Sequence, residues 1–118
     1  MALTTAGRNL IAGLMTGDSA LTFDNTRAYL GAGDSTTAFS AAHTDLQAVT
    51  NKMRKAMDTN FPTTTANVLV FQATFQTGDA NFAWEEWGVF NATSGPTMLS
   101  RKVESLGTKV NTQIWQFS

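Results

Sequence analysis

The segment from Asn81 to Phe90 constrains the fold most, because it combines large aromatic side chains, two adjacent carboxylates and one glycine. In an extended strand, alternate residues face opposite sides. One face would hold Phe82, Trp84, Glu86, Gly88 and Phe90, and the other would hold Ala83, Glu85, Trp87 and Val89. Since both faces carry large apolar groups, we expect the core to cover one and something else to cover the other. Such a strand, in a chain without a visible catalytic motif, indicates an assembly subunit.

Composition favours a protein that binds other proteins. The 118 residues are enough for a single domain, 1–118, and 42% of them are apolar, which supplies an ordinary core. Only 14% are charged, against about 25% in a typical globular domain. A polar but uncharged surface suits protein contacts, because few charges must be desolvated when a partner docks. A threonine-rich β-protein without such a role would have the same composition.

Charge and hydropathy argue against nucleic acid and membranes as partners. The net charge is −1, and the cluster Lys52-Met-Arg54-Lys55 is more typical of a solvated face than of a nucleic-acid patch. No stretch approaches the apolar length of a transmembrane helix. The N-terminus lacks the basic and apolar regions of a signal peptide, so we expect a protein made in the cytoplasm. The absence of cysteine excludes disulfides and thiolate metal sites.

The hydrophobic pattern predicts a mainly β fold, an antiparallel β-sandwich with a short N-terminal helix. Thr4 or Thr5 is a suitable cap for a helix that runs to about Thr16, and Gly17 would end it. Alternation and turn residues predict strands at 27–31, 67–77, 82–90, 98–103 and 110–117. We also expect one helical turn at 45–49, a turn at 61–65, and either a helix or a strand at 51–59.

No residue pattern indicates an enzyme. His43, the only histidine, has no nearby serine and acid pattern typical of a catalytic triad. Glu85 and Glu86 are adjacent, so in a strand they point to opposite faces and cannot act as a glycosidase pair. The glycine-rich stretch 31–34 lacks the lysine and hydroxyl of a phosphate loop. The aspartates match no calcium-loop spacing, and we expect neither a cofactor nor a metal.

Glu86 is expected to form a structural contact with one of two cations. Glu86 should lie inward, hydrogen-bonded to backbone or paired with a cation, because an unpaired buried carboxylate is costly. Its candidate partners are Arg101 and Lys109.

The aromatic strand and the last strand supply the interface candidates. Gly88 should mark a β-bulge or the close approach of an aromatic ring, Trp84 or Phe90, because glycine weakens a strand interior. Whichever of Trp84 and Trp87 faces outward is the expected contact anchor. Trp115 should be buried in the core or against a neighbouring subunit, and the strand that carries it should pair within the sheet.

A series of short motifs carries a family resemblance. The motifs are Leu3-Thr-Thr-Ala-Gly7, Leu30-Gly-Ala-Gly-Asp34, Leu46, Glu86-Trp-Gly-Val-Phe90, Met98-Leu-Ser-Arg101 and Lys109. Their order resembles that of the N-terminal attachment domain of tailed-phage tail fibres, and is similar to that of small minor tail or structural proteins of siphophages. The version here reads Glu-Glu-Trp-Gly where the fibre pattern has Glu-Ile-Gly.

The resemblance implies a virion structural protein, assembled in the host cytoplasm. The first hypothesis is a small oligomeric subunit of the tail, collar or baseplate, with other copies of itself and other virion proteins as partners. The alternative is a head-decoration (cement) protein bound to the capsid surface. The third is a carbohydrate-binding module that uses Trp84 or Trp87.

Overall fold

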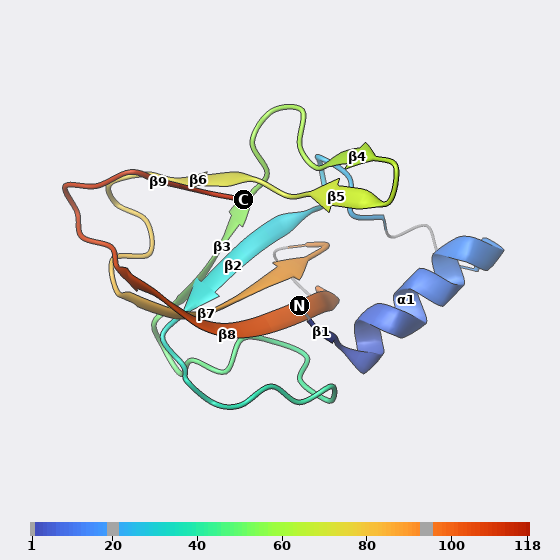
Figure 1. Cartoon of the computed structure of the whole chain (residues 1–118), viewed down its shortest axis with the longest axis horizontal. Helices are drawn as coiled ribbons and strands as arrows, with labels where there is room; N and C mark the ends of the chain where they lie inside the picture. Colours follow the sequence, from blue (N-terminus) through green and yellow to red (C-terminus); the bar gives the residue numbers. More distant parts are fainter. Residues whose placement is uncertain (1, 19–21, 93–95) are drawn as a thin grey trace.

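The computed structural model describes residues 2–18, 22–92 and 96–118. It confirms the expected fold class, because the chain is mainly β and antiparallel with one N-terminal helix (Figure 1). The elements are β1 (Ala2–Leu3), α1 (Thr5–Thr16), β2 (Tyr29–Gly33), β3 (Lys52–Ala56), β4 (Thr63–Thr65), β5 (Val68–Val70), β6 (Ala73–Phe75), β7 (Ala83–Phe90), β8 (Met98–Thr108) and β9 (Trp115–Phe117).

Three sheets form the β structure in the described part of the chain. A five-stranded sheet has the order β1-β8-β7-β2-β3, and two two-stranded sheets pair β4 with β5 and β6 with β9. Figure 1 shows both small sheets above the large one. Phe75 of β6 and the partly buried Phe117 of β9 pack against the buried Trp84 and Leu30 of the large sheet. The layers therefore form a sandwich-like core between the large sheet and β6–β9.

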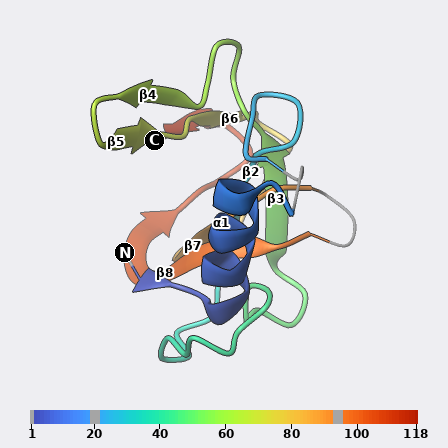
Figure 2. The same ribbon diagram turned by 90° about the vertical axis from the view of Figure 1, so that its right-hand side faces the viewer.

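Helix α1 begins and ends where the sequence predicts. The Thr4 hydroxyl accepts a hydrogen bond from the Gly7 N–H at 2.9 Å and donates to the Met98 carbonyl, so the cap also fixes the helix to β8. The helix ends at Gly17, whose φ of 81° is in the left-handed region that glycine favours. Figure 2 shows α1 in front of the five-stranded sheet.

The expected helical turn at 45–49 is wrong. Residues 34–51 form no helix. They connect β2 to β3 along an irregular path in which Leu46 and Ala48 are buried. The backbone N–H groups of Gln47 and Ala48 donate to the Glu86 carboxylate instead of to helical carbonyls. A distant acceptor thus overrides the local preference for a helical turn.

Several strand boundaries also differ from the prediction. The first expected strand lies two residues later, the ambiguous 51–59 contains β3, and the expected turn at 61–65 contains β4. The predicted strand 67–77 divides into β5 and β6, because β5 pairs with β4 and β6 pairs with β9. Only the last three residues of 110–117 form a strand, and Ile114 is 58% exposed. Strand β9 does pair, although with β6 in a separate small sheet, and Trp115 packs on the core but is only partly buried.

Trp84 and Glu86 lie on different sides of the large sheet. Trp84 pairs with Gly107 and Glu86 pairs with Val103, so β8 has extra residues between the two pairs and the ladder is irregular here. Trp84 joins the main core with Val89, whereas Glu86 faces the 34–51 segment. The prediction that Trp84 and Glu86 share a face is therefore wrong. Strand β7 is covered on both sides as predicted, but by parts of this chain rather than by a partner.

Gly88 marks a close approach of backbone, not of an aromatic ring. A Cβ at this position would lie 2.7 Å from the Ser100 carbonyl oxygen of the neighbouring strand. The register shifts of β7 lie between Trp84 and Glu86 and between Val89 and Phe90, so neither is at Gly88. Both forms of the sequence prediction for Gly88 are wrong, although the underlying expectation of a packing reason is correct.

We expect Gly88→Ala to lower the free energy of unfolding by about 1–3 kcal/mol, the usual cost of overpacking. The new methyl group must displace β8 backbone, which cannot move without weakening the β7–β8 ladder. Urea denaturation followed by tryptophan fluorescence measures the loss. Gly78→Ala is the matched control, because a Cβ there would meet nothing within 4 Å. Equal stability of the two variants would contradict the steric argument.

Candidate functional site

Glu86 and Arg101 form a buried ion pair beneath the 34–51 segment. The Arg101 Nε–H donates to Glu86 Oε1 at 2.7 Å, and both side chains are fully buried. This confirms one of the two expected partners of Glu86. A buried pair is costly to break, because removing one partner leaves an uncompensated charge away from water.

The carboxylate of Glu86 also organises the backbone above it. Its oxygens accept from the N–H groups of Gln47 and Ala48, both at 2.8 Å, and of Ser35 at 3.3 Å. Arg101 Nη2 donates to the Thr37 carbonyl at 2.9 Å. The pair therefore fixes both ends of the 34–51 segment on the sheet. With its oxygens occupied and no exposure to solvent, Glu86 is a structural residue in this conformation.

Lys109 is buried but lies elsewhere. Its ammonium donates to the Gln76 carbonyl at 2.6 Å and to Asn81 Oδ1 at 2.9 Å. Lys109 directly follows β8, so these two hydrogen bonds attach the 76–81 turn to the end of that strand. Lys109 is therefore not a partner of Glu86. The sequence could not separate the two candidates, because it does not show that Val103 lies opposite Glu86, with Arg101 two residues away along β8 and Lys109 beyond the register shift.

Asp79 in the same turn gives a pH-dependent prediction. A hydrogen bond from Lys55, and a second from the Gln76 N–H, hold the pKa of Asp79 below its ordinary value. Ionised Asp79 therefore stabilises the fold above the unfolded-state pKa of about 3.9, and this contribution is lost as the pH falls through the lower folded-state pKa. We expect Asp79→Asn to destabilise the fold at neutral pH and to match the parent in acid.

Urea denaturation over a pH series measures this difference. The control is Asp18→Asn, which changes an exposed carboxylate beyond the end of α1. If the difference in free energy of unfolding between Asp79→Asn and the parent stayed constant down to the acid range, the stabilising role of ionised Asp79 would be contradicted.

The aromatic candidates divide between two clusters. Trp84 is buried, with its ring 4.7 Å from Phe75 and 5.1 Å from Trp115, centroid to centroid. Phe90 is buried in a separate cluster with Leu46 and Met98. Neither Trp84 nor Phe90 is available as a contact residue in this conformation.

Trp87 is the outward one of the two tryptophans. It is partly buried, packs edge-on against Phe117 and donates its indole N–H to Glu104 at 3.1 Å. That hydrogen bond holds the pKa of Glu104 below its usual value. The prediction that one of the pair faces outward therefore applies to Trp87, whose ring borders an apolar cleft.

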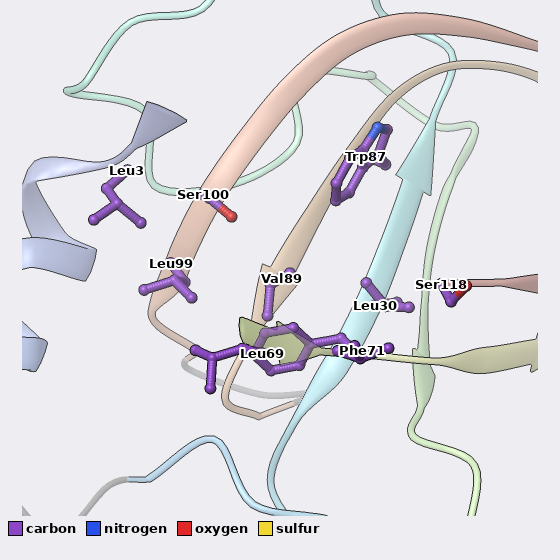
Figure 3. A pocket seen from close by; sticks show the side chains of 10 residues that line it. Leu3, Leu30, Leu69, Phe71, Trp87, Val89, Leu99, Ser100 and Ser118 are labelled. Atoms are coloured by element: carbon purple, nitrogen blue, oxygen red, sulfur yellow. The ribbon is translucent and has the colours of Figure 1, made fainter. Parts of the chain in front are cut away.

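The apolar cleft lies between the large sheet and the segment that contains β5 (Figure 3). It has a volume of about 450 Å³. Leu69 and Phe71 lie on one side and Trp87 lies across from them, while the Ser100 oxygen points inward. The lining residues are Leu3, Leu30, Leu69, Val70, Phe71, Trp87, Val89, Leu99, Ser100 and Ser118. A second cavity, of about 240 Å³, lies between α1 and the hairpin and shares Leu69, Phe71 and Leu99 with the first.

The cleft offers apolar contact rather than acid–base chemistry. None of the ten described lining side chains is titratable, and the buried Ser100 hydroxyl has no hydrogen-bond partner among the described residues. His43 lies outside it, where its Nδ1 accepts from the Ser40 N–H and its ring contacts Phe39. Within residues 2–18, 22–92 and 96–118, no three histidine or acidic side chains gather where they could hold a metal ion.

Hairpin β4–β5 forms the rim of the cleft and exposes apolar side chains. Val68 is 55% exposed and Leu69 is 57% exposed. The run from Thr59 to Gly78, which contains the hairpin, has no aspartate, glutamate, lysine, arginine or histidine. Depletion of charge together with exposed apolar groups is typical of the core of a protein interface. This uncharged run is visible in the sequence, and it is the signal by which the surface could have been found.

Comparisons with protein-family models, with curated proteins and with solved structures found no match for this chain. The one helix in the described regions is too short to cross a membrane.

Proposed function

We propose that this protein is a small structural subunit of a tailed-phage particle, located on the tail, collar or baseplate. The observation that carries the assembly role is the uncharged hairpin β4–β5, which exposes Val68 and Leu69 beside the open apolar cleft. Exposed apolar groups of this kind mark sites of protein contact. The order of the sequence motifs supports the choice of a phage particle.

The residues of the cleft support binding rather than catalysis. The residues described along it include no titratable side chain to act as an acid or a base, and its volume lies within the range of ordinary binding pockets, roughly 300–1,000 Å³. An inserted apolar side chain from another virion protein would bury against Leu30, Val89 and Trp87. A hydrogen-bonding group beside that side chain would satisfy the Ser100 hydroxyl.

The location can be tested on particles purified from the phage that carries the gene. Heads and tails are separated, and an antibody against this chain is used for immunogold labelling of each. Label on tails supports the proposal, and label on head surfaces supports the alternative of a head-decoration protein. Absence of the chain from both fractions, by mass spectrometry, would overturn the virion role.

The contribution of the hairpin is tested by incorporation of variants into particles. We expect Leu69→Lys to reduce incorporation by at least tenfold, because a charge would be buried in the contact. The matched control is Ile114→Lys, which places the same charge at a similarly exposed apolar residue outside the hairpin and the cleft. Equal incorporation of both variants would show that the hairpin is not the docking surface.

A further inference from the structure

Strand β4 has an edge that is neither paired nor protected. Its three threonines are all exposed, and no backbone hydrogen bond joins residues 63–65 to any described element except β5. An antiparallel strand that is paired on one side directs every second residue's N–H and C=O groups outward. These groups are a template for another strand.

In contrast to β4, the free edges of the large sheet carry charges. Strand β3 presents Lys52, Arg54 and Lys55 along five residues. The free part of β8 carries Lys102 and Glu104 and is interrupted by the bulge. Charges and bulges of this kind prevent pairing between sheet edges. Strand β4 has neither, and the hairpin it belongs to has only three residues in each strand. A two-stranded hairpin is marginal in water, and additional strands stabilise it.

We propose that the partner of β4 is the β4 strand of a second copy of this chain, paired antiparallel about Thr64. In this register Thr64 lies opposite Thr64 of the second copy, and Thr63 lies opposite Thr65. Threonine pairs are favourable across antiparallel strands, and no like charges meet. Antiparallel pairing of β3 with β3 of a second copy would place Arg54 opposite Arg54, and these like charges would repel each other. Charge therefore selects β4 over β3 as the self-complementary edge.

The resulting sheet would have the order β5-β4-β4-β5 across a twofold axis. Each hairpin would gain a partner, with Leu69 of both copies on one face of the new sheet and Val68 of both copies on the other. Self-pairing of identical strands is the isologous contact that closes a dimer. The inference deepens the assembly role by naming a partner, and it rests on the same hairpin.

Crosslinking tests the register directly, because the chain contains no cysteine and an introduced thiol is the only one. In the paired strands, the two Thr64 Cβ atoms would be roughly 5 Å apart. We expect Thr64→Cys to form a covalent dimer with a short thiol crosslinker at least tenfold faster than Thr108→Cys. The latter makes the same substitution at an exposed strand residue of β8. Equal rates for the two variants would overturn the proposal.

Sedimentation velocity tests the association without modification. We expect the parent chain to dimerise as its concentration rises from about 1 μM to about 1 mM, a range that covers weak interfaces. Thr64→Lys should raise the dimer dissociation constant at least tenfold while leaving the circular dichroism spectrum unchanged. A chain that stays monomeric throughout, or a dimer that Thr64→Lys does not weaken, would overturn the inference. A monomer that still labels virions would leave the assembly role standing with a different partner.

Discussion

Arg101→Met is expected to lower the free energy of unfolding by about 3–5 kcal/mol, the usual cost of removing one partner of a buried ion pair. The substitution would leave the Glu86 carboxylate fully buried with backbone donors alone. It would also remove the hydrogen bond to the Thr37 carbonyl, so the 34–51 segment would lose an anchor near its N-terminal end. Typical domains have only about 5–15 kcal/mol of stability in total, so the variant should be close to unfolding at ambient temperature.

Two further variants separate the charge effect from the packing effect. Lys102→Met changes an exposed cation on the same strand and should alter stability by less than about 0.5 kcal/mol. Glu86→Gln keeps the shape of the side chain and should cost about 1–3 kcal/mol. Urea denaturation measures all three. If Arg101→Met were as stable as Lys102→Met, the ion pair would not hold the 34–51 segment in place.

Trp84→Ala is expected to cost about 3–5 kcal/mol, the range for truncating a large buried aromatic residue. Trp84 lies at the centre of the aromatic cluster, with ring centroids 4.7 Å from Phe75, 5.1 Å from Trp115 and 5.8 Å from Phe117. It also donates its indole N–H to the Ala80 carbonyl at 3.0 Å. The substitution would open a cavity where the large sheet meets β6–β9.

Thermal unfolding followed by circular dichroism measures this loss. Ile114→Ala is the control, because Ile114 adjoins β9 but is mostly exposed and should change stability by less than about 0.5 kcal/mol. A double variant with Phe117→Ala should cost less than the sum of the single variants, because the two side chains are in contact. Additive losses would show that the cluster does not act as a unit.

The sequence predicted the features of the fold that depend on residues close together in the chain. The cap at Thr4, the helix end at Gly17 and the long strand β7 all follow from nearest-neighbour chemistry and periodicity. The class of the fold followed from the same signals. The inward facing of Glu86 and its pairing with a cation also followed, because the cost of burying a carboxylate is a general one.

Long-range geometry explains what the sequence could not provide. Trp84 departs from the regular alternation of β7 at a register shift between β7 and β8, and alternation within β7 carries no information about that irregularity. The break between β5 and β6 depends on their different pairing partners. The cleft is formed by residues from five strands and the loops beside them, so no short window of sequence could have predicted it.

The hydrogen bonds of Glu86 imply an unusual distribution of hydrogen-exchange protection. Loops without regular structure usually exchange their amide protons rapidly, since their donors face water. In the 34–51 segment, the amides of Gln47 and Ala48 are directed at a fully buried carboxylate, so they can exchange only when the segment lifts from the sheet. The irregular part of this chain would then be among its slowest to exchange, whereas the outward amide of the regular strand β4 would be among the fastest.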